Sequence, residues 1–502
     1  MFLSALVWIP VLAAAIITAL PAARARAIAL VVSWGLAFWS LVLLVQFDPT
    51  QPGLIFDEAV PWLQELGLTY HLGLDGLSLP MIILNAFLTV VAIYSTGEKV
   101  ERSRFYYSLM LILSGAAAGA FLAQDLLLFF LFYEIELIPL YFLIAIWGGA
   151  RRGYAATKFL LYTATSGILI LASFLGLVLL SGAATFDYNT TLAHSLPLGT
   201  QVILLAILAV GFGVKIPIFP FHTWLPDAHV EASTPVSVLL AGVLLKLGTY
   251  GLLRFGVGLF PDAWGVLAPV MATWAAVSAL FGALAAIAQQ DMKKVVAYSS
   301  IAHMAYILLA AAAGTPLSLI AAVAQMLSHG IISALLFLAV GLVAKKAGTR
   351  DVTILRGLLN PQRGLPLVGS LTILGAMASA GIPGMVGFVS EFLVFRSSFP
   401  IFPIQTLLCL VGTGLTAVYF LLTINRAFFG RLAPEFSRLP KVFWGDLVPA
   451  LALALLAIVF GIQPNWLVRW SEVETAALAI PSMQQVAVID IAPPTAPTLL
   501  GQ

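Results

Sequence analysis

Charged residues and cysteine are scarce in this chain of 502 residues. Asp, Glu, Lys and Arg together make up 9% of the sequence, whereas hydrophobic residues make up 61% and the mean hydropathy is +1.04. A soluble domain cannot bury that much apolar surface, so we expect lipid to be the solvent for most of the chain. The net charge of +2 is too small to indicate nucleic-acid binding.

Motifs for redox and phosphate chemistry are also missing. A single cysteine, Cys409, excludes a disulfide framework and a cysteine-based metal or iron–sulfur site. No glycine-rich motif for a phosphate or a dinucleotide occurs, and no pair of residues resembles a nucleophile with its base. We therefore expect neither a metal site nor a cofactor in this chain.

Long apolar runs are abundant instead. Fourteen segments approach or exceed the roughly 20 residues that a helix needs to cross a bilayer. They lie at 2–20, 28–47, 78–96, 105–123, 126–147, 158–181, 201–221, 234–256, 265–288, 295–313, 316–343, 365–395, 402–425 and 446–464. We predict an all-α polytopic membrane protein in which the seventh and twelfth segments are broken by proline or glycine.

Basic residues are distributed unevenly between alternate loops. If the N-terminus lies outside the cytoplasm, only Arg254, Arg396 and Arg469 fall on the outer side, and Lys215 and Lys246 fall within the membrane. The rest of the 24 Lys and Arg residues fall in inner loops. Because basic residues are retained on the cytoplasmic side, both termini are predicted to face away from it.

Five parts of the chain are expected. They are residues 1–104 with three helices and an acidic outer loop at 48–77, residues 105–256 and 257–430 as two five-helix repeats, residues 431–474 with the last helix, and residues 475–502 as a loosely ordered tail. Broken helices at comparable places in two halves are typical of repeats with inverted topology.

The break in the seventh segment is the most informative feature. Lys215 lies in an apolar run that Pro217 and Pro220 interrupt at once, and the next run contains Lys246. Membrane transporters use helices broken beside a buried charge, because freed backbone groups and charged side chains line a polar path.

A polar cluster of His222, Asp227 and His229 follows this break. The predicted orientation assigns the cluster to the inner side of the membrane. We therefore expect it at the place where protons enter rather than in the pump itself.

Two glutamates lie at membrane depth in the fifth segment. A charge at a helix centre costs about 2.5–3.5 kcal/mol, so a chain with several such charges is expected to move ions or protons. Glu134 and Glu136 are two residues apart and point about 200° apart on a helix. We interpret Glu134 as the mobile partner of Lys215, and we favour a structural or interface role for Glu136.

Two histidines and a third glutamate extend this series. His303 and His329 lie in the middle of their segments, where an imidazole can relay protons or can simply be a hydrogen-bonded core residue. Pro383, with glycines on both sides, interrupts the twelfth segment just before Glu391, as Pro217 interrupts the seventh segment beside Lys215.

Six stretches carry a resemblance to a known family: YEIELIPLYF, VKIPIFPFHTWLPDAHVEA, LLKLGTYGLLRF, DMKKVVAYSSIAHM, MLSHG and GIPGMVGFVSEF. Over nearly its whole length the chain resembles the antiporter-like membrane subunits of respiratory complex I and of the photosynthetic type I NAD(P)H dehydrogenase. By motif position, the resemblance assigns proton translocation to Glu134, Lys215, Lys246, His303, His329 and Glu391.

Among the three paralogues of that family, the chain is most similar to the M-type subunit, also called chain 4 or D. Glu391 stands where the other two paralogues carry lysine. Two stretches are similar to cyanobacterial and chloroplast D subunits, namely ELIP around Glu136 and GGARRGYAATKF at 148–159. Tyr133 departs from the pattern, since those subunits usually carry tryptophan there. The resemblance points to a divergent cyanobacterial subunit, with the CO2-uptake variant as one form.

The resemblance implies a proton-translocating subunit of a membrane-bound NAD(P)H/ferredoxin:plastoquinone oxidoreductase in the thylakoid. Partner subunits, with L-type and N-type antiporter-like neighbours among them, would use the quinone, the iron–sulfur clusters and NAD(P)H or ferredoxin. Two alternatives stay open. A stand-alone cation/proton antiporter is disfavoured by Glu391 and by the absence of a dedicated cation cage, and a non-pumping scaffold subunit would use its charges for assembly alone.

Overall fold

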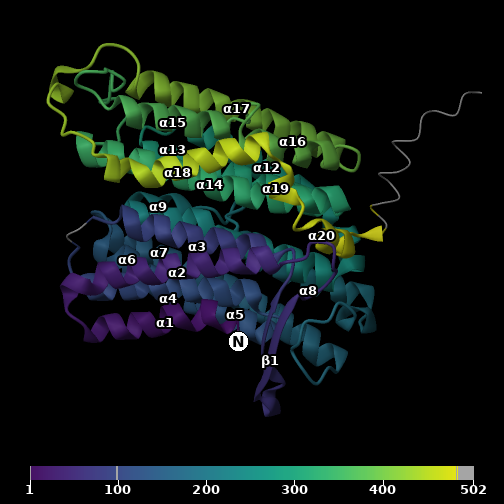
Figure 1. Cartoon of the computed structure of the whole chain (residues 1–502). Helices are drawn as coiled ribbons and strands as arrows, with labels where there is room; N and C mark the ends of the chain where they lie inside the picture. The colour runs from purple at the N-terminus through teal and green to yellow at the C-terminus, as the bar shows by residue number, and fades with distance from the viewer. Residues whose placement is uncertain (1, 98–99, 482, 484–502) are drawn as a thin grey trace, which may run out of the picture.

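The computed structural model describes residues 2–97, 100–481 and 483 of the chain. Lys99, which we assigned to an inner loop, and residues 482 and 484–502 of the predicted tail lie outside the described residues. Helices dominate the described part and run roughly parallel to one another (Figure 1). In lipid a helix satisfies its own backbone groups, so apolar runs of this length fold as helices.

The helices up to the first break are α1 (Ser4–Ala19), α2 (Ala25–Gln46), α3 (Ser78–Ser95), α4 (Ser103–Leu122), α5 (Leu126–Ile135), α6 (Leu137–Trp147), α7 (Arg152–Ser181) and α8 (Leu198–Lys215). After the short α9 (Trp224–Glu231), one span is built from α10 (Thr234–Leu239), the π-helix η4 (Leu240–Leu244), α11 (Leu245–Gly251) and the π-helix η5 (Leu252–Val257).

The second half contains α12 (Pro261–Ile287), α13 (Met292–Ala313), α14 (Pro316–Ala347), α15 (Pro366–Ser379), α16 (Val386–Ser398), α17 (Pro403–Ala427), α18 (Trp444–Ile462), α19 (Asn465–Val468) and α20 (Glu472–Leu478). Short 3-10 helices are η1 (Ala22–Arg24), η2 (Gln64–Leu66), η3 (Leu192–Ser195) and η6 (Pro434–Phe436). Residues 475–478 of the predicted tail thus belong to α20.

Twelve helical segments within the described residues are long and apolar enough to cross a membrane. Each corresponds to one of the fourteen predicted segments. The remaining two are α1, with 16 residues, and the predicted segment 365–395, which is divided between α15 and α16. A polytopic helical membrane protein is therefore confirmed, whereas the count of fourteen spans is not confirmed by helix length.

Within the described residues, the spans that carry Lys246, His303 and His329 are the most enclosed ones. The spans Thr234–Val257, Met292–Ala313 and Pro316–Ala347 are 100%, 94% and 94% buried by other helices, whereas α2 and α18 are 33% buried. Lys246, His303 and His329 are therefore shielded from lipid by a complete layer of helices.

Both predicted helix breaks are present. α8 ends at Lys215 because Pro217 and Pro220 cannot continue its hydrogen bonding, and a turn leads to α9. Between α15 and α16, Gly381 and Gly384 adopt φ values of +68° and +90° on either side of Pro383. Only glycine adopts such values readily, so this turn needs both residues.

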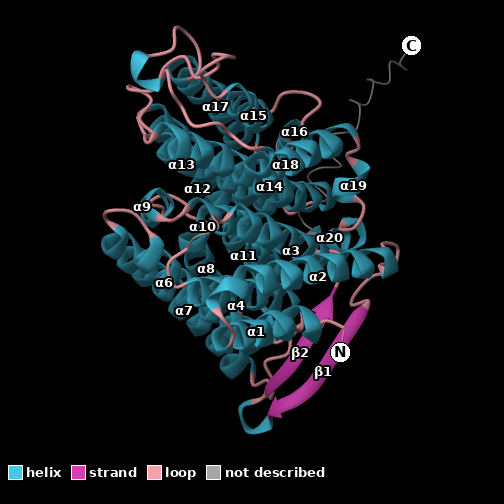
Figure 2. Ribbon diagram, turned by 60° about the vertical axis from the view of Figure 1, so that its left-hand side comes forward, coloured by secondary structure: helices cyan, strands magenta, loops and turns pink. Residues whose placement is uncertain are grey.

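The acidic outer loop at 48–77 contains two strands that the sequence analysis did not predict. β1 (Phe56–Leu63) pairs with β2 (Leu68–Leu74) in an antiparallel hairpin, with Phe56 opposite Leu74 and Val60 opposite Tyr70. The hairpin projects from one end of the helical bundle (Figure 2).

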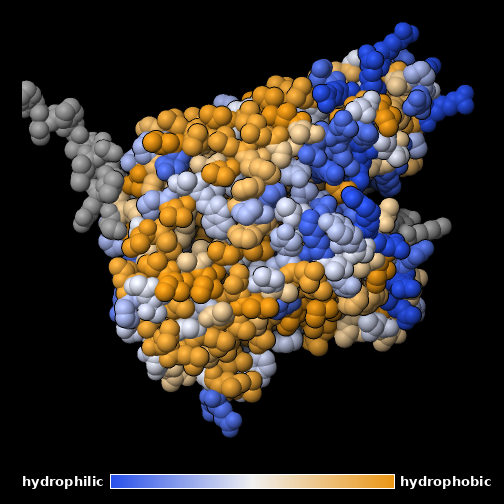
Figure 3. All heavy atoms as spheres, turned by 180° about the vertical axis from the view of Figure 1, so that it is seen from behind, coloured by the Kyte–Doolittle hydropathy of each residue, from blue (hydrophilic) through white to orange (hydrophobic). Residues whose placement is uncertain are grey.

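Hydrophilic residues gather at the opposite end of the bundle, while its flanks are hydrophobic (Figure 3). Side-chain contacts join the helix ends that flank the loops here, since Arg104 donates to the Thr18 carbonyl at 3.1 Å and the Lys345 Nζ lies 3.2 Å from Asp446. Exposed basic residues of these loops include Arg24, Arg102, Arg151, Arg152, Lys345, Arg431, Arg438 and Lys441. The side of the membrane that this basic end faces stays a prediction.

A buried charged cluster ties the C-terminal segment to the hairpin end. Arg254 of η5 is 2% exposed and pairs with Asp75, the residue that caps α3, and with Glu474 of α20 at 3.4 Å. Rings of Tyr188 and Tyr250 lie 5.5 and 5.6 Å from the guanidinium. The cluster thereby joins three elements that are far apart in the sequence.

We expect Asp75→Asn to lower the free energy of unfolding by about 3 kcal/mol, because it weakens the compensation of a buried guanidinium. Asparagine can still accept the hydrogen bonds at the start of α3, so the loss of stability reports on the removed negative charge. Unfolding in detergent by chemical denaturant measures it. The control Asp57→Asn alters a half-exposed contact to His71 and is expected to cost below about 1 kcal/mol. Equal losses in the two variants would contradict a special role for the Arg254 cluster.

Candidate functional site

Lys215 and Glu136 form an ion pair at the first helix break. Their side chains are 1% and 0% exposed, and the Lys215 Nζ also lies 4.6 Å from the ring centre of Tyr133. Glu136 stands at the junction between α5 and α6. Pro139 provides no hydrogen for the carbonyl of Ile135, which loosens the helix at this junction.

This pair corrects our interpretation of the two glutamates, in which Glu134 was the partner of Lys215. The two carboxylates point to different sides of the helix, and the one directed at the end of α8 belongs to Glu136. Glu134 faces α7 instead, where a methyl group added at Gly167 would collide with its carboxylate. Its Oε1 is buried and accepts no hydrogen bond from the described residues.

Lys246 lies directly after the π-helix η4 and is 0% exposed. Its Nζ donates to the carbonyl of Ala241 at 2.7 Å and lies 2.7 Å from Nδ1 of His329. The ammonium can donate to Nδ1 only when the other nitrogen of that ring, Nε2, carries the hydrogen. π-helical turns are rare overall but frequent at functional sites, and the carbonyl that Lys246 binds belongs to such a turn.

The helix that carries Lys246 also touches Lys215. At Gly248 of α11 the backbones come so close that an added Cβ would lie 3.2 Å from the Cβ of Lys215 and 3.2 Å from the nitrogen of Ile216. The absence of a side chain at Gly248 thus brings the two lysine-bearing helices together.

His303 pairs with Glu391 at the second helix break. Its Nε2 lies 3.3 Å from Oε1 of Glu391 and 3.0 Å from the Ser379 carbonyl, which ends α15, and its Nδ1 lies 2.7 Å from the Ser299 carbonyl. Carbonyl oxygens only accept hydrogen bonds, so both ring nitrogens must carry hydrogen to satisfy these contacts. The geometry suits an imidazole that carries hydrogen on both nitrogens beside the carboxyl group of Glu391.

A small polar cavity connects the two histidines, whose ring centres are 5.9 Å apart. It offers about 10 Å³, which is about the room one water molecule needs. His329 Nε2, Gln325 Oε1, Ser328 Oγ and both oxygens of Glu391 are buried there without a hydrogen bond to the described residues. Such a lining suits a bridging water, so a proton has a short route from His329 to His303.

The three residues expected where protons enter lie in different surroundings. Asp227 forms a partly exposed ion pair with Lys158 at 2.7 Å. His222 packs against aromatic rings, and His229 is 0% exposed and stacked on Phe337 at 4.4 Å. His222 interacts electrostatically with Lys158, the partner of Asp227, whereas His229 interacts with Lys246 and Lys293.

Two contributions were missed from the sequence. The importance of Glu136 could have been inferred from Pro139, three residues later, which loosens the helix beside the carboxylate. The polar lining formed by Gln325, Ser328 and Ser333 has the i, i+3 and i+8 spacing of one helical face, the face on which His329 also lies. That pattern was visible in the sequence of α14.

Comparisons with known proteins identify relatives over most of the chain. The family described as NADH:quinone oxidoreductase/Mrp antiporter, transmembrane, matches residues 123–416. NAD(P)H-quinone oxidoreductase chain 4 1 of Synechococcus sp. (strain JA-3-3Ab) is 42% identical over 492 residues, which cover 95% of this chain and 93% of the relative. Chain 4 3 of Trichormus variabilis is 38% identical, with 97% and 93% covered.

Solved structures are similar over the same extent. A chain of respiratory complex I from Thermus thermophilus superposes with a TM-score of 0.85 at 28% identity, covering 95% of this chain and 99% of that chain. A chain of the Mrp complex from Dietzia sp. DQ12-45-1b has a TM-score of 0.85 at 22% identity, with 96% and 98% covered. The second likeness concerns the fold alone.

We expect Glu136→Gln to lower the free energy of unfolding by about 3–5 kcal/mol, because it leaves the ammonium of Lys215 buried without a carboxylate. Glu134→Gln is the matched control on the same helix and is expected to cost below about 1 kcal/mol, since Glu134 accepts no hydrogen bond there. Denaturant unfolding in detergent compares the two variants. A larger loss for Glu134→Gln would contradict the pairing described here.

Proposed function

The chain belongs to the NADH:quinone oxidoreductase/Mrp antiporter transmembrane family, and on this premise we propose that it translocates protons as the antiporter-like chain 4 subunit of a membrane-bound NAD(P)H-quinone oxidoreductase. The observation that supports this function most is the series of buried ionisable contacts. It runs from Glu136 and Lys215 through Lys246 and His329 to His303 and Glu391.

The switch of the pump is the ion pair between Lys215 and Glu136. Both residues stand at helix interruptions, where a side chain can change partner without unwinding a regular helix. When the carboxylate withdraws, the buried ammonium loses its compensating charge and gives up its proton more readily. Glu134 lies against Gly167 of α7 and is a second carboxylate that interacts electrostatically with Lys215.

From Lys215 the proton passes to Lys246, across the close approach of α8 and α11 at Gly248. The contacts then set the order of the histidines, because His329 touches Lys246 and His303 touches Glu391. Glu391 releases the proton on the outer side. Each proton moved against 100 mV stores about 2.3 kcal/mol.

Partner subunits supply the driving reaction. Quinone, NAD(P)H or ferredoxin, and the iron–sulfur clusters belong to them, and this chain contributes proton movement. The related structures come from multi-subunit membrane complexes, and the related sequences come from cyanobacteria. On this basis we assign the chain to the thylakoid membrane between L-type and N-type neighbours, with both termini in the lumen and with the CO2-uptake complex as one setting.

His222, Asp227 and His229 remain our candidates for the region where protons enter from the inner side. The ion pair of Asp227 with Lys158 is partly exposed, so it can exchange protons with water. The division of the chain into two inverted repeats is part of the same proposal, with Lys215 and Glu391 at equivalent breaks.

The test replaces Lys215 by alanine in the complete complex and measures quinone-driven proton uptake into vesicles. We expect proton uptake per assembled complex to fall several-fold, because the switch has lost its ammonium. Lys345→Ala is the control, since Lys345 is 59% exposed and pairs with Asp446 at the surface.

Unchanged uptake in assembled Lys215→Ala complexes would refute the pump and favour a scaffold role. Sodium-dependent proton exchange by the chain alone in vesicles would favour the stand-alone antiporter instead. The experiment therefore separates the three functions by activity and by the need for partners.

A further inference from the structure

Lys293 is a third lysine in the part of the chain that the structure describes whose ammonium is enclosed by protein, besides Lys215 and Lys246. It lies in the first turn of α13 and is 3% exposed. Its Nζ donates to the carbonyls of Ala232 at 2.7 Å and His229 at 3.1 Å, and to Oγ of Ser237 at 3.3 Å. None of these acceptors is a carboxylate, so the cost of burying the charge is only partly offset.

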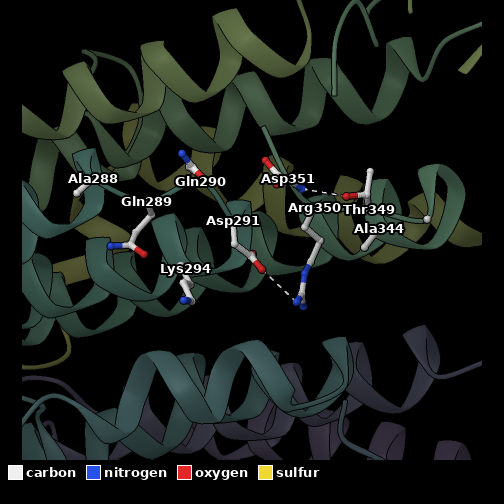
Figure 4. A pocket seen from close by; sticks show the side chains of 10 residues that line it. Ala288, Gln289, Gln290, Asp291, Lys294, Ala344, Thr349, Arg350 and Asp351 are labelled. Carbon is white, nitrogen blue, oxygen red and sulfur yellow. Dashed lines mark hydrogen bonds and ion pairs between the residues drawn. The ribbon is translucent and has the colours of Figure 1, made fainter. Parts of the chain in front are cut away.

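An open cleft lies next to Lys293 at the basic end of the bundle. It has a volume of about 690 Å³ and lies between the α12–α13 turn and the loop after α14 (Figure 4). Asp291 and Arg350, both in its lining, form an ion pair at 3.1 Å. Asp291 also accepts from the backbone nitrogen of Lys293 at 2.7 Å, and Arg350 donates to the Val230 carbonyl near the end of α9. Asp291 and Arg350 thus line the cleft and also interact electrostatically with the ammonium of Lys293.

The ammonium groups of Lys293 and Lys246 lie close to the same helical span. Lys293 binds Ser237, and the side chain of Lys246 runs back along its own span to bind Ala241. Ser237 and Ala241 are four residues apart, which is a rise of about 6 Å. The two lysines therefore bind that span little more than one turn apart.

The ring of His229 lies in the same region and interacts electrostatically with both lysines. It is 0% exposed, and neither ring nitrogen forms a hydrogen bond with the described residues. A neutral imidazole has one nitrogen that accepts a proton and one that releases it. His229 is therefore suited to pass a proton between the two lysines.

We propose that Lys293 is a proton-carrying residue that links the cleft lined by Asp291 and Arg350 to Lys246 by way of His229. The ammonium of Lys293 releases one proton to His229 and takes up another from water in the cleft, so charge and atoms balance over a cycle. The inference rests on the proposed function and adds to it a route that reaches Lys246 without passing Lys215.

A purely structural role makes a different prediction. A lysine side chain beside the C-terminal end of a helix can bind the last carbonyl groups of that helix. Lys293, which belongs to α13, binds the carbonyl groups at the end of α9 in this way. Arginine would also bind them, but it does not lose its proton in proteins. The variant Lys293→Arg therefore keeps the structural role and removes proton transfer.

The test uses the complete complex and measures the number of protons moved per quinone reduced. We expect Lys293→Arg and Lys293→Gln to lower this ratio several-fold in assembled complexes. Lys346→Arg is the matched control, because Lys346 binds the Lys441 carbonyl at 2.6 Å at the same end of the bundle, outside the proposed route. The control is expected to keep the normal ratio.

A normal ratio in Lys293→Arg would overturn the proposal and assign Lys293 to the end of α9. The proposal would also be overturned if neither Lys293 variant assembled into the complex while the Lys346→Arg control did. The result also separates the two proposals. If Lys215→Ala stops pumping and Lys293→Arg does not, only the further inference fails, whereas normal pumping in Lys215→Ala refutes the proposed function itself.

Discussion

The ion pair between Lys215 and Glu136 is the interaction on which the rest of the structure depends. Removing either partner leaves the other charge buried without a compensating charge, at a cost of about 3–5 kcal/mol. Both helices are interrupted at the pair, at Pro217 and at the junction after Ile135. An interrupted helix has free backbone groups and room for a side chain to move, so the pair is both enclosed and able to open.

The other ionisable residues follow from the same constraint. Lys246 and Lys293 are surrounded by carbonyl, hydroxyl and imidazole groups instead of carboxylates, and His303 has an acceptor on each ring nitrogen. Lys246 and His303 each lie within reach of a side chain that can take up a proton, His329 and Glu391 respectively. The enclosing helices make this possible, because the spans that carry these residues are almost fully covered by other helices. A proton path across the membrane needs such a layer of helices between the path and the lipid.

Much of this arrangement could be predicted from the sequence. Apolar runs revealed the spans, Pro217 and Pro383 revealed the breaks, and the rarity of buried charge singled out Lys215, Lys246 and Glu391. The hairpin β1–β2 was missed because its outer strand is mostly exposed and lacks an alternating apolar pattern. The partner of Lys215 was misassigned because two glutamates two residues apart cannot be told apart by spacing when their neighbours are unknown.

The sequence by itself determined the solvent of the chain, the broken helices and the residue types available for proton transfer, since these depend on composition and local backbone chemistry. Only the tertiary structure decided which groups meet. It paired Glu136 with Lys215, set His329 against Lys246 and enclosed Lys293, which the sequence places among the basic residues of an inner loop. Contacts between helices far apart in the chain depend on packing, and no local pattern in either helix specifies them.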